Sequence, residues 1–269
     1  MKPEIGVAAP GTAGAEEAPL VLATRSGARL DVTINRPAKR NALSRATLEA
    51  LKSAFEAHAG DEGIKIAVLT GAGEKSFAAG GDLVEFAMLR SEGEAADMSR
   101  RAREALDAIR GFPVPVVAAL NGDALGGGAE LAMACDMRVA AAHARLGFVQ
   151  GRLAITTAWG GGIDLRALVG PSRALALLCR SEIMDAGAAR EAGLVDGVGA
   201  LLGDTVDAFV APMLERSRHV LAAFKALSLA QRRGATREEM ERVETAVFAG
   251  TWVHDDHWAA ADAILTRRP

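Results

Sequence analysis

Two hydrophobic patterns alternate along the first two-thirds of the chain. Short apolar runs at residues 64–71 and 114–119 have the length and β-branched content of buried strands. Residues 20–37 predict two further short strands, which turn at Ser26–Gly27 and end at Pro37. Between these runs, apolar residues recur at helical spacing. Because strands alternate with helices, the pattern predicts an α/β fold.

Several helices have recognisable first turns. Ser44 is a candidate N-cap for a helix that places Leu48, Leu51 and Phe55 on one face. Another helix is predicted from Pro171 to Cys179, since proline is favoured in a first helical turn.

The pattern also predicts a loop and two further helices. Residues 91–97 are polar and acidic and predict a surface loop, and a helix of mixed charge follows over 98–109. A further helix is predicted from about residue 161.

The chain divides into three predicted parts. Residues 1–18 are rich in Ala, Gly, Pro and Glu and predict a flexible tail. Residues 19–200 hold the alternating strands and helices. Residues 201–269 are almost entirely helical in pattern, which indicates a C-terminal layer suited to oligomerisation.

Composition narrows the class of protein. A hydrophobic content of 50% in 269 residues supports a sizeable core, and a net charge of −3 argues against a nucleic-acid partner. No apolar run is long enough to cross a membrane, and the first residues lack the apolar core of a signal peptide. The two cysteines, Cys135 and Cys179, do not form a CxxC pair. We therefore expect neither a disulfide framework nor a metal cluster, and a cytoplasmic location.

One segment, residues 121–137, combines features of a reactive site. It reads NGDALGGGAELAMACDM and follows an apolar strand pattern. Glycines 126–128 allow close backbone approach where a strand passes into a helix, and the first N–H groups of a helix favour a negative oxygen. Glu130 lies within one turn of them and can act as an acid or base. Alone, the pattern equally fits a tight packing turn with Glu130 as a surface carboxylate.

A second glycine turn, FAAGGD at residues 77–82, also leads from a strand pattern into a helix. Other motifs fail on spacing. GAGEKS lacks the third glycine of a dinucleotide-binding loop, no GK[ST] triplet occurs, and GPSRA lacks the last glycine of a nucleophile elbow. The run HDDH at 254–257 cannot enclose one metal ion, because successive helical side chains point in different directions.

The two glycine turns, with INRPAKRNALS, AWGGGIDLRALVG and EAGLVDGV, resemble the crotonase superfamily, also called the enoyl-CoA hydratase/isomerase family. The matching pieces cover most of the chain in the family's order. The resemblance implies a crotonase-like spiral of ββα units with a helical C-terminal region, assembled as a homotrimer or hexamer. It also implies an acyl-CoA substrate, with coenzyme A entering as part of that substrate and no permanently bound cofactor.

The resemblance also assigns roles to residues. Two backbone N–H groups, of Gly81 and Gly127, are expected to bind the thioester carbonyl and to stabilise the enolate oxygen. Glu130 is the expected catalytic carboxylate. The residues expected to hold coenzyme A, apart from these glycines, are Ala38, Ala42, Ala78, Ala79, Asp82, Leu83 and, at the phosphates, Lys225. The acyl pocket is expected to be walled by Phe86, Met88, Leu89, Phe148 and Trp159.

One position departs from the family pattern. Hydratases of the family use a second glutamate, and the aligned residue here is Gln150. An amide can hold a water molecule but cannot exchange a proton with it. FVQ, the TTAWGG run and GTW near Thr251 are similar to a subgroup with decarboxylases for short malonyl-type thioesters. The sequence therefore favours decarboxylation or isomerisation, with hydration of a 2-enoyl-CoA and a non-catalytic acyl-CoA-binding protein as alternatives.

Overall fold

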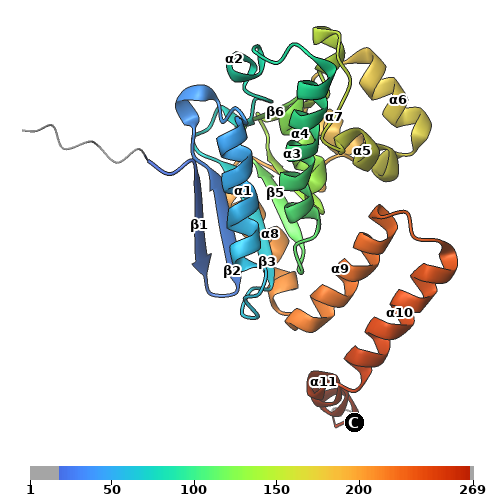
Figure 1. Ribbon diagram of the computed structural model, residues 1–269. Helices are drawn as coiled ribbons and strands as arrows, with labels where there is room; N and C mark the ends of the chain where they lie inside the picture. The colour runs from blue at the N-terminus through green and yellow to red at the C-terminus, as the bar shows by residue number, and fades with distance from the viewer. Residues whose placement is uncertain (1–17, 267–269) are drawn as a thin grey trace, which may run out of the picture.

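The computed structural model describes residues 18–266, so most of the predicted tail at 1–18 lies outside the described residues. Two sheets form the centre of the fold (Figure 1). The six strands of the larger sheet, in spatial order, are β1 (Val21–Ser26), β2 (Arg29–Ile34), β3 (Ile66–Gly71), β5 (Val116–Leu120), β7 (Met137–Ala141) and β10 (Gly197–Gly199). The smaller sheet contains β4 (Ser76–Ala78), β6 (Asp123–Leu125), β8 (Arg145–Gly147) and β9 (Met184–Asp185).

From β3 to β8, consecutive strands contribute alternately to the two sheets. β3, β5 and β7 pair in parallel in the larger sheet, and the strands that follow them, β4, β6 and β8, pair in parallel in the smaller one. The outer pairs β1–β2 and β8–β9 are antiparallel. The structure therefore confirms the predicted spiral of ββα units, including the hairpin that turns at Ser26–Gly27.

Helices cover both faces of the larger sheet. The helical segments are η1 (Pro37–Lys39), α1 (Arg45–His58), α2 (Leu83–Phe86), α3 (Glu92–Arg110), α4 (Gly127–Ala134), η2 (Gln150–Leu153), α5 (Gly161–Val169), α6 (Pro171–Arg180), α7 (Ala186–Glu191), α8 (Leu202–Leu214), α9 (Arg218–Arg232), α10 (Arg237–Trp252) and α11 (Asp255–Leu265). Alternate residues of β3 face opposite sides: Ala67 and Leu69 join the main core, whereas Ile66 and Val68 pack with Val206 of α8.

The last three helices extend away from the sheets, with α9 beside α10 and α11 at the far end (Figure 1). The helical pattern predicted for the C-terminal third is confirmed. None of the described helices is both long and apolar enough to be a candidate membrane span.

The prediction for residues 91–109 was wrong at its start. α3 begins at Glu92 and includes the segment expected to be a loop. Ser91 accepts a hydrogen bond from the Glu94 amide at 3.3 Å, and Glu94 accepts one from the Ser91 amide at 3.0 Å. This reciprocal cap satisfies the first N–H groups, so a polar, acidic sequence forms the first helical turn. Ser44 caps α1 as predicted, by accepting from the Thr47 amide at 3.2 Å.

Asn121 joins the ends of β3 and β5 to the start of β4, the strand that leads into the glycine turn at residues 77–82. Its Oδ1 accepts hydrogen bonds from the Gly71 amide at 3.0 Å and from the Thr70 hydroxyl at 3.3 Å. Its Nδ2 donates to the carbonyls of Gly73 at 2.6 Å and Ser76 at 3.2 Å. The side chain is buried, so it replaces water as the partner of all four groups.

We expect Asn121→Ala to lower the free energy of unfolding by about 2–4 kcal/mol, because buried polar groups lose their partners. Urea unfolding followed by circular dichroism measures this change. Asn35→Ala is the matched control: Asn35 makes one side-chain bond, to the Pro19 carbonyl, and should cost less than about 1 kcal/mol. Equal losses in both variants would contradict the assigned role of Asn121.

Candidate active site

The two glycine turns lie against each other and form one side of a pocket of about 480 Å³. A side chain at Gly128 would place its Cβ 1.9 Å from the Ala78 carbonyl oxygen, and one at Gly80 would lie 3.2 Å from the Leu125 carbonyl oxygen. Gly80 and Gly126 have φ angles of +111° and +54°, which residues other than glycine rarely adopt. Only glycine therefore allows these turns to approach so closely.

Peptide geometry directs one N–H group from each turn away from the protein's own hydrogen bonds. The Gly80 carbonyl accepts from the Leu43 amide at 2.8 Å, and the Gly126 carbonyl accepts from the Glu130 amide at 3.1 Å. In a trans peptide the next N–H group points in the opposite direction. The N–H groups of Gly81 and Gly127 are therefore directed away from these partners, and both glycines line the pocket.

The Trp159 ring covers both glycines. A Cβ at Gly127 would lie 2.3 Å from this ring, and a Cβ at Gly81 would lie 2.9 Å from Phe86 and 3.4 Å from Trp159. The indole nitrogen donates to the Met98 sulfur at 3.4 Å, which fixes the ring from α3. Gly81 and Gly127 are thus glycines because aromatic rings occupy the space of a side chain.

Glu130 lies in this pocket near the start of α4 and is 3% exposed. Its carboxylate accepts backbone hydrogen bonds from Trp159 at 2.8 Å, Gly161 at 3.0 Å and Ala158 at 3.3 Å. Burial raises the pKa of Glu130, and these hydrogen bonds oppose that rise without cancelling it. The group is therefore easier to protonate than an exposed glutamate.

Gln150 is the fourth partner of Glu130. Its Nε2 donates to Glu130 Oε1 at 3.0 Å, while its own Oε1 is buried without a hydrogen-bond partner in the described structure. Among the described residues that line the pocket, Glu130 is the only carboxylate. The free amide oxygen can accept a hydrogen bond from a water or a hydroxyl group placed in the pocket.

The other predicted contact residues divide into two groups. Ala79 and Leu83 line the pocket, whereas Ala38, Ala42, Ala78 and Asp82 do not. Asp82 and the Ala42 carbonyl instead both accept hydrogen bonds from Arg36, which holds the 38–43 loop beside the glycine turn at residues 77–82.

The predicted pocket wall needs correction. Phe86, Leu89 and Trp159 line the pocket, but Met88 and Phe148 do not. Met88 is 77% exposed at the surface, and Phe148 is 2% exposed within the main core. Hydrophobicity alone does not distinguish these apolar neighbours. Sequence reasoning also missed Met98 as a pocket residue. It placed the start of the helix at Met98, whereas α3 begins at Glu92.

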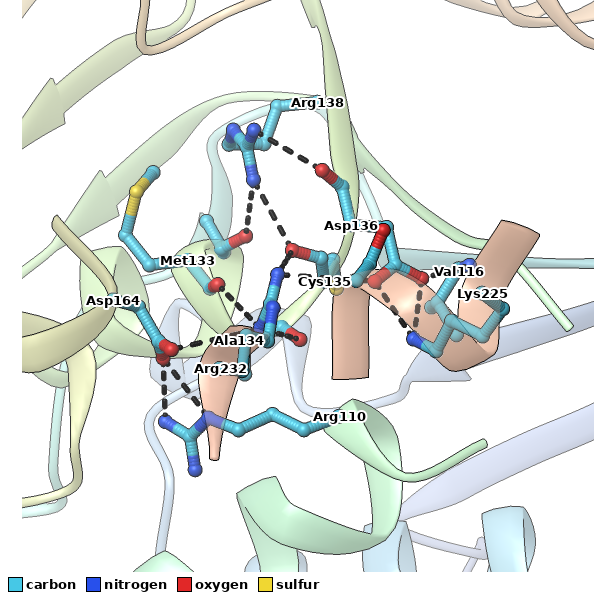
Figure 2. A network of polar contacts seen from close by, with 12 residues as sticks. Arg110, Val116, Met133, Ala134, Cys135, Asp136, Arg138, Asp164, Lys225 and Arg232 are labelled. Atoms are coloured by element: carbon cyan, nitrogen blue, oxygen red, sulfur yellow. Dashed lines mark hydrogen bonds and ion pairs between the residues drawn. The ribbon is translucent and has the colours of Figure 1, made fainter. Parts of the chain in front are cut away.

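The structure places Lys225 in the core and not at a surface open to phosphates. Its Nζ donates to both carboxylate oxygens of Asp136, at 2.7 and 2.6 Å, and the side chain is 3% exposed (Figure 2). Burial lowers the pKa of Lys225, and Asp136 opposes that shift. The predicted contact with coenzyme A phosphates is therefore replaced by a buried ion pair between α9 and the end of α4.

The same network caps the C-terminal end of α4. Arg232 donates to the carbonyls of Ala134 at 3.0 Å and Cys135 at 2.7 Å, and Arg138 donates to Cys135 at 3.2 Å (Figure 2). Positive charge at a helix C-terminus stabilises the helix dipole. The Cys135 thiol is fully buried here and its pKa is raised to about 12, whereas Cys179 on α6 is exposed.

The HDDH run begins α11, and His254 is its N-cap. His219 of α9 approaches this run, so that donor atoms of His219, His254 and Asp256 lie within 4.8 Å of one another. His254 Nδ1 accepts the Asp256 amide hydrogen bond at 3.2 Å. Because the cap uses this nitrogen, we interpret the cluster as the capped start of a helix.

Comparison with known proteins gives one consistent result. The sequence model of a family described as enoyl-CoA hydratase/isomerase matches residues 25–268. The chain is similar to a crotonyl-CoA hydratase of Syntrophomonas wolfei, at 41% identity over 61% of this chain and 63% of the relative. It is also similar to a probable enoyl-CoA hydratase of Bacillus subtilis, at 32% identity over 88% of this chain and 92% of the relative. The match thus spans less than two-thirds of the first relative and most of the second.

Solved structures agree in fold. An enoyl-CoA hydratase of Mycobacterium smegmatis superposes with a TM-score of 0.87 at 31% identity, over 93% of this chain and 97% of that one. An enoyl-CoA hydratase of Bacillus anthracis superposes with a TM-score of 0.86 at 29% identity, over the same shares of the two chains.

We expect Lys225→Met to lower the free energy of unfolding by about 3–5 kcal/mol, because it removes the nearer cation of the buried Asp136 carboxylate and leaves only Arg232, at 3.8 Å. Adding Asp136→Asn should recover part of the loss, since the uncharged amide can still accept the Val116 hydrogen bond. Urea unfolding measures both. Calorimetric titration with coenzyme A should show unchanged affinity in folded Lys225→Met. Weakened binding at full stability would instead support a phosphate contact.

Proposed function

This chain belongs to the enoyl-CoA hydratase/isomerase family, and we propose that it catalyses proton transfer on an acyl-CoA thioester. The observation that carries the proposal is the convergence of Gly81, Gly127 and Glu130 on one pocket. In such a site the thioester oxygen would accept from the two glycine N–H groups. These donors are fixed by neighbouring hydrogen bonds, so they would stabilise an enolate oxygen with little reorganisation.

We propose hydration of a short-chain 2-enoyl-CoA as the reaction. The hydratase names of the relatives support it, and so does the polar end of the pocket. A water held by Gln150 Oε1 would add its oxygen to C3 of the enoyl group while Glu130 takes one of its protons. Electrons then move onto the thioester oxygen, at the Gly81 and Gly127 N–H groups. Glu130 returns the proton to C2, which completes the addition of water.

The raised pKa of Glu130 suits this cycle, because one group must both accept and return a proton. Coenzyme A would enter only as part of the substrate. The approach to the pocket includes the exposed side chain of Leu83, beside the 79–82 turn.

Decarboxylation is the second candidate, and Gln150 is the observation that favours it. Loss of CO₂ from a malonyl-type thioester leaves its bonding electrons as the enolate, so no base is needed. A proton from Glu130 would then complete the product. Isomerisation of a double bond would use the same hole and the same carboxylate. None of the relatives described above is named a decarboxylase, so we place hydration first.

Rates with crotonyl-CoA and methylmalonyl-CoA distinguish these reactions. We expect wild-type protein to hydrate crotonyl-CoA faster than it releases CO₂ from methylmalonyl-CoA. Glu130→Gln should lower hydration by on the order of 10²–10⁴-fold, the usual contribution of an acid–base group. Gln150→Glu should raise hydration, because it supplies a second proton-transfer group.

Three outcomes would contradict the proposal. Faster CO₂ release by the wild-type protein, with weaker methylmalonyl-CoA binding in Gln150→Glu, would establish decarboxylation, since like charges repel in a buried pocket. Hydration that survives Glu130→Gln would remove Glu130 from the mechanism. Binding of several acyl-CoA compounds without turnover of any would indicate a non-catalytic binding protein.

We further propose that the chain forms a homotrimer or hexamer through its C-terminal helices. No residue of α10 or α11 is buried, and Phe248, Trp252 and Trp258 are exposed there. Apolar surface of this kind is typical of an interface.

Light scattering at micromolar concentration should give the mass of a trimer or a hexamer. Phe248→Glu should shift the population to smaller species, because it places a charge in the interface. Glu244→Gln on the same helix is the control and should not. A monomeric wild-type protein would contradict the assembly.

A further inference from the structure

The turn that donates to Glu130 is itself held from its outer side by α3. Ser99 Oγ donates to the Ala158 carbonyl at 2.7 Å, and Arg103 Nη2 donates to the same oxygen at 3.0 Å. Arg110 Nη2 donates to the Trp159 carbonyl at 2.9 Å. Ser99 and Arg103 lie four residues apart, and Arg110 lies seven further along, so all three project from one side of the helix.

The first of these contacts acts on the peptide group that holds the carboxylate. The Ala158 carbonyl and the Trp159 N–H belong to one planar peptide unit and point in opposite directions. Its oxygen accepts from Ser99 and Arg103, and its N–H donates to Glu130 at 2.8 Å. Donors at a carbonyl polarise the peptide and strengthen its N–H as a donor. The two α3 side chains therefore reach Glu130 through a single peptide.

Arg110 holds the following peptide group, between Trp159 and Gly160, and the start of α5. It is 8% exposed and pairs with Asp164, in the first turn of α5, at 2.8 Å (Figure 2). Gly160, between the two donors to Glu130, has a φ of +92°, and a Cβ there would lie 2.8 Å from Arg110 Nη2. A Cβ at Gly161 would lie 2.5 Å from the Cα, Cβ and Cγ of Glu130. The segment is thus confined between α3 on one side and Glu130 on the other.

We propose that Ser99, Arg103 and Arg110 are positioning residues for Glu130, which act through the peptide groups of residues 158–160. None of the three lines the pocket together with Glu130, so they need not touch the substrate. This inference rests on the proposed role of Glu130 in proton transfer. It adds that Glu130 is positioned by side chains of α3 that do not themselves line the pocket.

The direction of the effect follows from the contacts of the carboxylate. The N–H bonds from Trp159, Gly161 and Ala158 favour the charged form of Glu130 and counteract the effect of burial. Weakening the α3 contacts should therefore raise its pKa further. The charged groups on the elements packed around it are Arg103 and Arg110 on α3, Asp164 on α5, and Arg90 at the pocket rim. Replacing Ser99 changes none of these charges.

The test is the pH dependence of kcat and kcat/KM for crotonyl-CoA hydration. We expect Ser99→Ala to move the midpoint assigned to Glu130 upward by about 0.5 pH unit, and Ser99→Ala with Arg103→Met by about 1 unit, since one unit corresponds to the partial loss of one charge-assisted hydrogen bond. At neutral pH, kcat should fall more than KM rises. Ser99→Thr keeps the hydroxyl and should retain the wild-type midpoint.

Arg101→Met is the matched control on the same helix. Arg101 is exposed and pairs only with Asp97 in the described structure, so its loss should leave the midpoint unchanged. Arg110→Lys keeps the charge beside Asp164 but loses the planar donor pair, and it should give an intermediate upward shift. Thermal unfolding of each variant separates a shifted midpoint from a loss of folded protein.

Glu130→Gln separates failure of this inference from failure of the proposed function. If the midpoint disappears in Glu130→Gln but does not move in Ser99→Ala with Arg103→Met, the α3 residues do not position Glu130. If the midpoint persists in Glu130→Gln, the titrating group is not Glu130 and the proposed function itself fails. A shift of equal size in Arg101→Met would show a general effect of α3 charge and would also overturn the inference.

Discussion

A carboxylate removed from water needs hydrogen-bond donors on every side, and this requirement at Glu130 organises the surrounding chain. Three donors are peptide N–H groups of one short turn, and the fourth is the Gln150 amide. Backbone donors cannot be supplied by changing a side chain, so the path of residues 158–161 must be fixed. That path in turn requires a left-handed glycine at 160 and contacts from α3.

The same turn connects the carboxylate with the two glycine N–H groups. Trp159 donates its backbone N–H to Glu130 and lays its ring over Gly81 and Gly127. A shift of this one residue would therefore disturb the proton-transfer group and the proposed oxyanion site together. Behind the site, Asp136 and its cations hold the far end of α4, so the helix that carries Glu130 is fixed at both ends.

Sequence reasoning reached the parts of the site that lie on local motifs. Gly81, Gly127 and Glu130 each belong to a strand–turn–helix pattern, and the resemblance carried by the two turns implied the fold. It failed where the partner is distant in the chain: Ser99 and Ala158 are 59 residues apart, and Lys225 and Asp136 are 89 apart. From sequence alone, a serine or an arginine on an amphipathic helix is indistinguishable from a solvated residue. At Ser91, acidic composition hid a capping box that local spacing could have revealed.

The burial of Cys135 gives the molecule a built-in chemical reporter. Thiol reagents attack the thiolate, and a pKa of about 12 leaves almost none of it at neutral pH in a side chain that solvent does not reach. Cys179 is exposed on α6 and is the other cysteine of the chain. A single labelled site therefore marks the closed protein. Modification of the second thiol requires the core around Cys135 to open, and its rate therefore reports how often the C-terminal end of α4 becomes exposed to solvent.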